Sequence, residues 1–164
     1  MKVTGLTKGS LYGNFRDKEE ISLEAFKYAV AKIKDLAKSE LDGISTYKGQ
    51  LIALLDFYAC YVFDPPVAGG CPMLNTAIEA DDAHPSMRTR VTKELMDTVN
   101  FIAALLSKGV RVGEFKKGIK PKEIAYTFFC AVEGAIMFSR VERSRQPMNI
   151  IVKHCKNMLE QISK

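Results

Sequence analysis

The amino-acid sequence predicts an all-α protein built as a helical bundle, and three observations carry that prediction. Apolar residues recur at steps of three and four over several long segments, as they do on one face of an amphipathic helix. Most of these segments begin at a proline or a capping residue, and several end near a glycine. No segment shows the apolar-polar alternation that is typical of a half-buried strand.

The first helix is expected from Lys18 to Leu41. Asp17 is a good N-cap for it, Glu20 completes a capping-box pattern, and Gly43 is placed to end it. The apolar face of this helix recurs at helical spacing and consists of Leu23, Phe26, Val30, Ile33, Ala37 and Leu41. A long amphipathic helix of this kind packs one side against a core.

Two further helices follow. One runs from about Tyr47 to Phe63. Its residues from Leu51 onward are apolar almost all round, with Asp56 as their lone charge, so we expect this helix to be largely buried. The prolines after Asp64 end it. A short helix is expected from Cys71 to Ala80, with a proline in its first turn.

Three long helices complete the prediction for the C-terminal half. Each has a proline where a first helical residue stands. Their expected ranges are Pro85 to about Val112, Pro121 to about Glu142, and from near Pro147 to the end, with a turn over 113–118. Helices with apolar stripes of this kind bury them against each other as a bundle.

The composition is that of a globular protein. Of 164 residues, 47% are hydrophobic and 26% are charged, and a chain of this length folds without a metal or disulfide. The four cysteines form no C-x-x-C pair and only two histidines are present, so we expect free thiols, no metal site and a reducing cytoplasm. The net charge of +5 permits nucleic-acid contact. No apolar run reaches the roughly 18 residues of a membrane span, so we expect no membrane partner.

The first twenty residues contain the most specific pattern. Gly5 is a tight-turn residue, Thr7 is an N-cap, and a helix of barely two turns follows to Phe15. A glycine turn before a short helix that starts with basic and hydroxyl residues is typical of the second half of a helix-turn-helix. Such residues donate hydrogen bonds to base edges and phosphates in the major groove.

This segment closely resembles the helix-turn-helix signature of the TetR (tetracycline-repressor-like) family of bacterial regulators. The shared pattern is a glycine turn, a hydroxyl cap, a recognition helix over about 7–15 that ends in tyrosine-x-x-phenylalanine, and a lysine-glutamate start to a long helix. The resemblance implies a remnant of the DNA-binding head over 1–17 and a regulatory, ligand-binding and dimerisation domain over 18–164. It implies that DNA is contacted by Thr7, Lys8, Gly9, Ser10, Tyr12 and Lys18.

One departure from the family matters for DNA binding. The family has roughly two more helices before this point, and these hold the recognition helix in place. A helix of this length is unstable alone in water. We therefore expect the chain as given to bind its operator weakly or not at all.

The later part of the chain resembles the family less specifically. The stretch from Gly70 to Asn75 is similar to the middle of many such regulatory domains, and the last two helices are similar to the pair that forms a four-helix bundle with a second subunit. Small residues in the first of these helices permit close approach. We place a homodimer interface at Ala131, Gly134, Ala135, Ile151, Cys155 and Met158.

Aromatic and sulfur-containing residues crowd the middle helices, with a few polar residues among them. This pattern is typical of a plain core and also of a small-molecule site. Because the resemblance favours an effector cavity, the candidate ligand residues are Tyr58, Tyr61, Asn75, Asn100 and Phe129. Glu133 lies in an apolar stretch and needs a partner or a raised pKa. It could bind the effector, lie in the dimer interface or face solvent, and we favour the interface.

The resemblance implies a ligand-responsive repressor that binds a palindromic operator as a homodimer and is released by a small-molecule effector of unknown identity. The alternative is a head-less dimerisation or small-molecule-binding module without DNA binding of its own. A small enzyme that uses Glu133 or Asp56 is disfavoured because the sequence has no catalytic motif. We expect no cofactor.

Overall fold

The computed structural model describes residues 13–80 and 84–164, and over these ranges the protein is all-α, as predicted. An isolated antiparallel bridge between Phe115 and Ser163 is the extent of β-structure in the described part. The helices are α2 (Lys18–Ser39), α3 (Tyr47–Tyr61), α4 (Pro72–Ala80), α5 (Pro85–Val112), α6 (Pro121–Glu142) and α7 (Gln146–Ile162). Five of the expected DNA contacts lie outside the described residues: Thr7, Lys8, Gly9, Ser10 and Tyr12.

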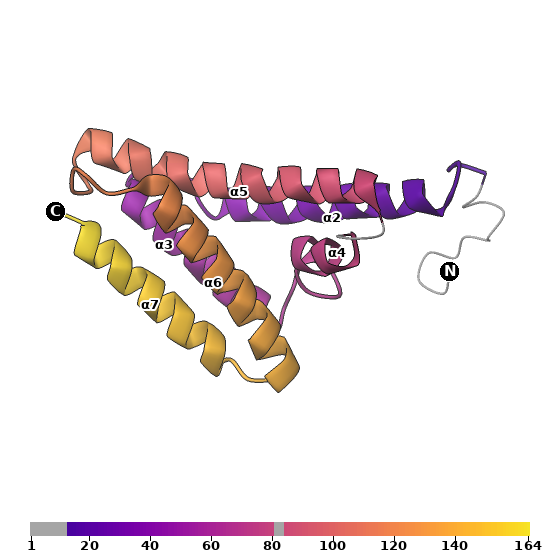
Figure 1. The fold of residues 1–164 in the computed structure, drawn as a ribbon. Coiled ribbons are helices and arrows are strands. Elements are labelled where there is room, and N and C mark those ends of the chain that lie inside the picture. The colour runs from indigo at the N-terminus through magenta and orange to yellow at the C-terminus, as the bar shows by residue number, and fades with distance from the viewer. Residues whose placement is uncertain (1–12, 81–83) are drawn as a thin grey trace.

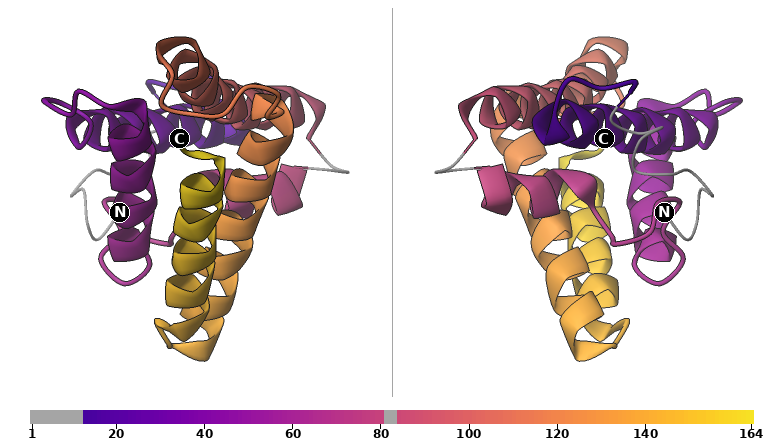
Figure 2. Two further views of the ribbon diagram at one scale, coloured as in Figure 1. Left: turned by 90° about the vertical axis from the view of Figure 1, so that its left-hand side faces the viewer. Right: turned by 90° about the vertical axis from the view of Figure 1, so that its right-hand side faces the viewer.

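Helix α5 runs along the upper side of the molecule in Figure 1 and is the longest of the described helices. It packs against α3, α4 and α6, while α7 packs against α6 and α3. The short helix α4 contacts both α2 and α5. Figure 2 shows α6 and α7 side by side as an antiparallel pair. In Figure 1 the start of α2 lies at the end of the molecule opposite the C-terminus and the turn between α5 and α6. Helix α2 therefore connects the N-terminal end with the body of the bundle.

The start of α2 follows the predicted capping pattern, with one difference. The Asp17 side chain accepts a hydrogen bond from the backbone N–H of Glu20 at 2.8 Å. The Glu20 carboxylate accepts from the backbone N–H of Arg16 at 2.6 Å, one residue before the partner that a capping box uses. This bond lowers the pKa of Glu20. The helix ends at Ser39, earlier than predicted, and Gly43 lies in the turn beyond it with a φ of +79°.

The turn between α5 and α6 also caps α3. The carboxylate of Glu114 accepts from the backbone N–H groups of Tyr47 at 3.1 Å and Lys48 at 2.8 Å. Phe115 in the same turn is fully buried, and its ring lies so close to Gly109 that a Cβ there would meet it at 2.4 Å. The turn is therefore part of the core.

Helix α6 is the one helix in the described part of the chain whose length and composition would allow it to cross a membrane. Core helices of globular proteins pass the same test. Here 39% of the apolar stretch is buried inside the fold, and the helix packs against both α5 and α7. Its apolar character is accounted for in part by the core of the bundle.

Candidate functional site

Two small cavities lie in the core on either side of Tyr58. The first, of about 30 Å³, is enclosed by α3, α5 and α6 and is lined by Leu51, Leu54, Leu55, Tyr58, Thr98, Ile102, Phe128, Phe129, Val132 and Glu133. The second, of about 10 Å³, lies between α2, α3, α5 and the start of α4. Both are bordered by Tyr58 and Thr98. We call the two together the inner site.

A buried carboxyl and a thiol meet at the inner site. The Cys71 thiol donates to Glu133 Oε1 at 3.1 Å, and both residues are buried. Glu133 Oε2 is also buried and has no hydrogen-bond partner among the described residues. Burial raises the pKa of Glu133, and the thiol hydrogen bond offsets part of that rise. Burial and the neighbouring carboxyl raise the pKa of Cys71 as well, so the thiol is not poised as a nucleophile.

Two tyrosines complete this acidic group. The Tyr61 hydroxyl donates to the carbonyl of Gly70 at 2.9 Å, and the ring centroids of Tyr58 and Tyr61 are 5.9 Å apart. Burial raises the pKa of both phenols, and the proximity of Cys71 and Glu133 raises it further. Tyr58, Tyr61, Cys71 and Glu133 thus form a cluster of weak acids in an apolar interior.

The loop before α4 is held over the end of α6. Gly70 has a φ of +90°, and a Cβ at this position would meet Arg140 Nε at 2.8 Å. The Arg140 guanidinium donates to the carbonyl of Val62 at 3.1 Å. This arrangement places Cys71, the next residue, against Glu133.

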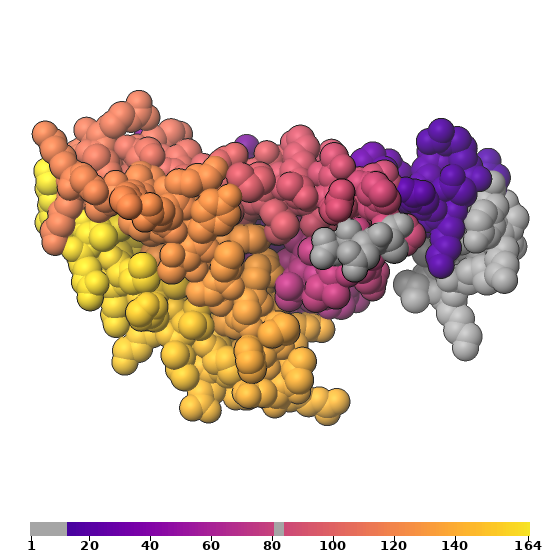
Figure 3. Space-filling model, in the orientation of Figure 1, coloured from indigo at the N-terminus to yellow at the C-terminus, as the bar shows by residue number. Residues whose placement is uncertain are grey.

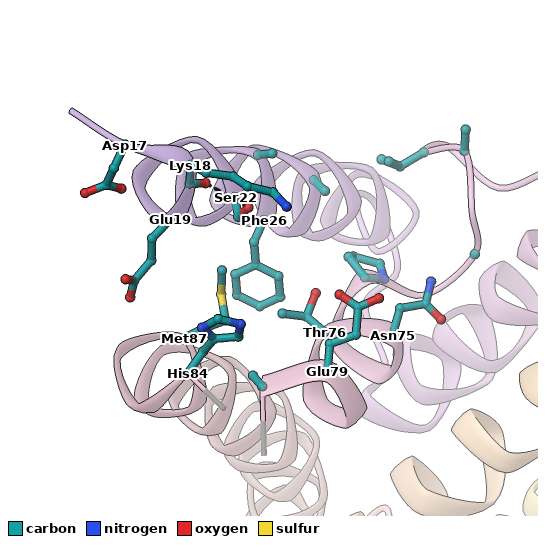
Figure 4. A pocket seen from close by; sticks show the side chains of 17 residues that line it. Asp17, Lys18, Glu19, Ser22, Phe26, Asn75, Thr76, Glu79, His84 and Met87 are labelled. Carbon is teal, nitrogen blue, oxygen red and sulfur yellow. Dashed lines mark hydrogen bonds between the residues drawn. The ribbon is translucent and has the colours of Figure 1, made fainter. Parts of the chain in front are cut away.

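A larger outer cleft of about 850 Å³ lies between α2, α4 and the start of α5. Figure 4 shows Phe26 pointing from α2 into this cleft toward Met87. Polar side chains at its edges include Lys18, Glu79 and His84. Pro72 borders both the outer cleft and the second inner cavity, so the first turn of α4 separates the two spaces.

The structure brings three of the five expected ligand residues together. Tyr58 and Phe129 line the first inner cavity, and Tyr61 lines the second. Asn75 instead lines the outer cleft, where its side chain donates to the carbonyl of Gly69 at 3.0 Å.

The placement of Asn100 corrects the sequence-based set. Asn100 is exposed and lines neither space, because it follows the buried Val99 on the outer side of α5. Its side chain accepts from Lys122 Nζ at 2.5 Å. Sequence reasoning also missed Cys71 and Thr98, although the glycine-cysteine-proline step before α4 marks the turn that delivers Cys71.

Glu133 does not lie in the interface that we favoured for it, because it is 8% exposed and bonded within its own chain. The other acid considered for catalysis, Asp56, is on the surface and pairs with Lys156 at 2.6 Å. The two carboxyls therefore do not share a pocket.

Lys18 is exposed at the first residue of α2.

The expected interface residues divide into two groups. Ala135 and Cys155 are buried inside the protomer, so they face its own core and have no surface to offer a partner. Ala131, Gly134, Ile151 and Met158 are half-buried along the α6–α7 pair. Figure 3 shows this pair as one continuous surface. Its exposed large apolar side chains, which sequence reasoning did not select, are Tyr126, Met137, Phe138, Val141 and Ile150.

Comparison with known proteins identifies the family. The family model described as "Tetracyclin repressor-like, C-terminal domain" matches residues 48–155. The chain belongs to the TetR family of transcriptional regulators. The resemblance found in the first twenty residues is thereby confirmed from a separate part of the chain.

Solved structures of TetR regulators share the fold over nearly the whole chain. A TetR transcriptional regulator from Chloroflexus aurantiacus J-10-FL is 34% identical with a TM-score of 0.93, covering 99% of this chain and 82% of that chain. A TetR-family regulator from Cytophaga hutchinsonii is 30% identical with a TM-score of 0.89, covering 99% and 81%. Among curated proteins, the HTH-type transcriptional repressor DhaR of Mycobacterium sp. (strain GP1) is 21% identical over 142 residues, 87% of this chain and 70% of the relative. These relatives are regulators and not enzymes.

Proposed function

We propose that this TetR-family chain is the regulatory part of a cytoplasmic repressor that binds a palindromic operator as a homodimer and leaves it when a small-molecule effector binds. The observation that carries the proposal is the position of α4. Its first turn separates the inner site from the outer cleft, and the helix packs against α2. Helix α2 begins directly after the segment that resembles the recognition helix.

Effector binding at the inner site requires movement of its walls. A cavity of about 30 Å³ holds little more than a water molecule. The second inner cavity, of about 10 Å³, is the one bordered by Cys71 and Pro72. Room for an effector comes most directly from outward displacement of these two residues toward the outer cleft, which Pro72 also borders. Because α4 contacts α2, an effector that prefers this open arrangement shifts the population toward a different α2 position.

The dimer is proposed to form through the α6–α7 pair. Val141 is 80% exposed, Ile150 58% and Phe138 56%, and a run of exposed apolar side chains marks an interaction surface. Two copies of the pair would pack as a four-helix bundle. The half-buried Ala131, Gly134, Ile151 and Met158 lie beside these side chains and remain part of the proposed interface, without Ala135 and Cys155.

The DNA contacts follow from the same arrangement. Two recognition helices related by the dimer axis match two half-sites of a palindrome. Thr7, Lys8, Gly9, Ser10 and Tyr12 are proposed to contact DNA, together with Lys18. The exposed ammonium of Lys18, at the first residue of α2, is available for a phosphate.

DNA binding is tested by fluorescence anisotropy with the DNA upstream of the gene. This chain is compared with a version extended upstream by about forty codons, enough for two helices of a helix-turn-helix head. We expect tight binding with a steep salt dependence from the extended version. Binding by neither version at low salt would contradict the repressor and favour a dimerisation or small-molecule-binding module.

The dimer surface is tested with two matched valine variants. Val141→Asp places a charge on the α6–α7 face, whereas Val112→Asp places it at the end of α5, where the side chain is 62% exposed. Light scattering after size-exclusion chromatography should give a monomer for Val141→Asp and a dimer for Val112→Asp. If both variants are dimers, the interface lies on a surface other than the α6–α7 pair.

A further inference from the structure

The chemistry of the inner site indicates the class of effector, and this inference rests on the proposed function. Glu133 is 8% exposed, its Oε1 accepts from the Cys71 thiol, and its Oε2 is buried without a partner among the described residues. A thiol is a weak donor. A buried carboxyl oxygen without a hydrogen-bond donor, such as Oε2, costs free energy that a ligand with a donor would recover.

Within residues 13–80 and 84–164, no cation is hydrogen-bonded to Glu133. The α3 helix presents Tyr58 and Tyr61, and the start of α4 presents Cys71, all of them weak acids that are neutral near neutral pH. Two cations lie near this cluster, and both have other partners. Arg140 influences Tyr61 and is bonded to the carbonyl of Val62. Lys34 lines the second cavity and is paired with Glu94 at 2.5 Å. Ionised Glu133 would therefore be an uncompensated negative charge in an apolar interior, which is a costly state.

The remaining walls of the same cavity are apolar and aromatic. Phe128 and Phe129 lie on α6 with Glu133, and Tyr58 faces them from α3. Aromatic faces attract cations that have been removed from water. An ammonium group beside Glu133 would thus meet a carboxylate and aromatic rings, with aliphatic side chains around its hydrocarbon part.

We propose that the inner site binds a small apolar molecule that carries a protonated amine, whose ammonium donates to Glu133 Oε2 while its hydrocarbon part lies among Tyr58, Phe128 and Phe129. Where the carboxyl is protonated in the free protein, its proton leaves to solvent when the ammonium binds. The amine itself keeps its proton, so one proton is released for each molecule bound.

The experiment uses two probes of the same shape, phenethylamine and phenethyl alcohol. Their affinities for the whole chain are measured by isothermal titration calorimetry, for the wild type, Glu133→Gln and Asp56→Asn. Asp56→Asn is the matched control, because Asp56 is an exposed carboxylate on the neighbouring helix α3 that is already paired with Lys156. Proton release is measured on the wild type alone, by comparing buffers with different ionisation enthalpies.

We expect the wild type and Asp56→Asn to bind the amine more tightly than the alcohol. Glu133→Gln should weaken amine binding at least about tenfold and leave alcohol binding within about twofold, since it removes only the charge. Amine affinity of the wild type should rise with pH while Glu133 is still protonated in the free protein, and proton release should accompany binding.

Three results would overturn the proposal. Equal affinity for the two probes would show that the charge of Glu133 is not used. Tighter binding of the alcohol, lost in Glu133→Gln, would show that a protonated Glu133 donates to a neutral acceptor. If neither probe binds at millimolar concentration, Oε2 accepts a hydrogen bond from a buried water and not from a ligand. Operator binding by the extended version requires no amine, so its failure is separate and concerns the proposed function.

Discussion

Two buried carboxylates in this core have opposite surroundings. Glu94 on α5 is 5% exposed and accepts from Lys34 Nζ at 2.5 Å and Arg90 Nη2 at 2.8 Å. Glu133 on α6 is buried to a similar degree, and its one hydrogen bond to the described residues is from a thiol. Burial alone therefore does not say what a core acid does. The partners of a buried carboxylate determine whether it stabilises the packing of helices or has an oxygen free to accept a hydrogen bond from a ligand.

The location of each carboxylate matches this difference. The Lys34–Glu94 pair joins α2 to α5 across 60 positions of sequence, and it ties the helix that leads toward the head to the centre of the bundle. Glu133 lies beside a cavity and is bonded to Cys71, the residue before α4. The ion pair of Glu94 stabilises the packing of α2 against α5, whereas Glu133 is a candidate contact for a ligand.

The largest expected effect comes from removing both cations from Glu94. Lys34→Met combined with Arg90→Met leaves a buried carboxylate without compensation, which should lower the free energy of unfolding by about 3 kcal/mol. Urea unfolding measures it. The control is Lys93→Met, whose pair with Asp97 is exposed on both sides and should contribute less than about 1 kcal/mol. An equal loss of unfolding free energy in the variant and the control would mean that the ion pairs of Glu94 do not stabilise the contact between α2 and α5.

The next effect concerns the loop that delivers Cys71 to Glu133. Gly70→Ala forces a left-handed backbone on alanine and pushes Arg140 from its place, at a cost of about 1–3 kcal/mol. Gly113→Ala is the matched control, since its φ is +86° but nothing lies within 4 Å of a Cβ there. Thermal unfolding should show the larger loss for Gly70→Ala. A larger loss for Gly113→Ala would contradict the contact between Gly70 and Arg140.

A third carboxylate sharpens the comparison, because its partners are backbone amides. Glu114→Ala removes the acceptor for two N–H groups at the start of α3 and should cost about 1 kcal/mol. Glu160→Ala, which removes an exposed partner of Lys48, should change the urea midpoint little. Similar effects in the two variants would remove the capping role assigned to Glu114.

The smallest effect is the pH dependence of Glu133. Its pKa in the folded state is raised above 4.5, so the folded protein holds the proton more tightly than the unfolded chain. The stability from this proton is fully present below that ordinary value and is lost as pH rises through the raised pKa. The free energy of unfolding of the wild type, measured with urea, should therefore fall relative to that of Glu133→Gln as pH rises from about 4 toward neutral. An unchanged difference would mean that Glu133 is not protonated by burial.

The helices could be predicted closely because their ends depend on local chemistry. Pro85 and Pro121 begin α5 and α6 as expected, and Gly113 ends α5 in the left-handed conformation that glycine adopts readily. Where the end signal was weaker, the prediction was off by one or two residues, as at Ser39, which ends α2.

The candidate site could be predicted only in part. Aromatic composition on a nearly all-apolar helix was enough to select Tyr58 and Tyr61. Composition did not predict on which side of α5 Asn100 lies. Consecutive residues of a helix are rotated by about 100° around its axis, so a neighbour of a core residue can face solvent. The structure buries Ala135 and Cys155 inside the protomer, which the sequence did not reveal, since a small or apolar residue suits a core as well as a contact between subunits.

The sequence by itself determined the all-α class, the helix ends and the family, because capping residues, proline positions and the recognition-helix pattern act over a few neighbouring positions. The tertiary structure alone decided that Cys71 donates to Glu133 across 62 positions of sequence. It also decided that, in the described part of the chain, Glu94 pairs with two cations while Glu133 pairs with none. These contacts depend on how whole helices pack. No local pattern encodes the partner that packing brings to a buried charge.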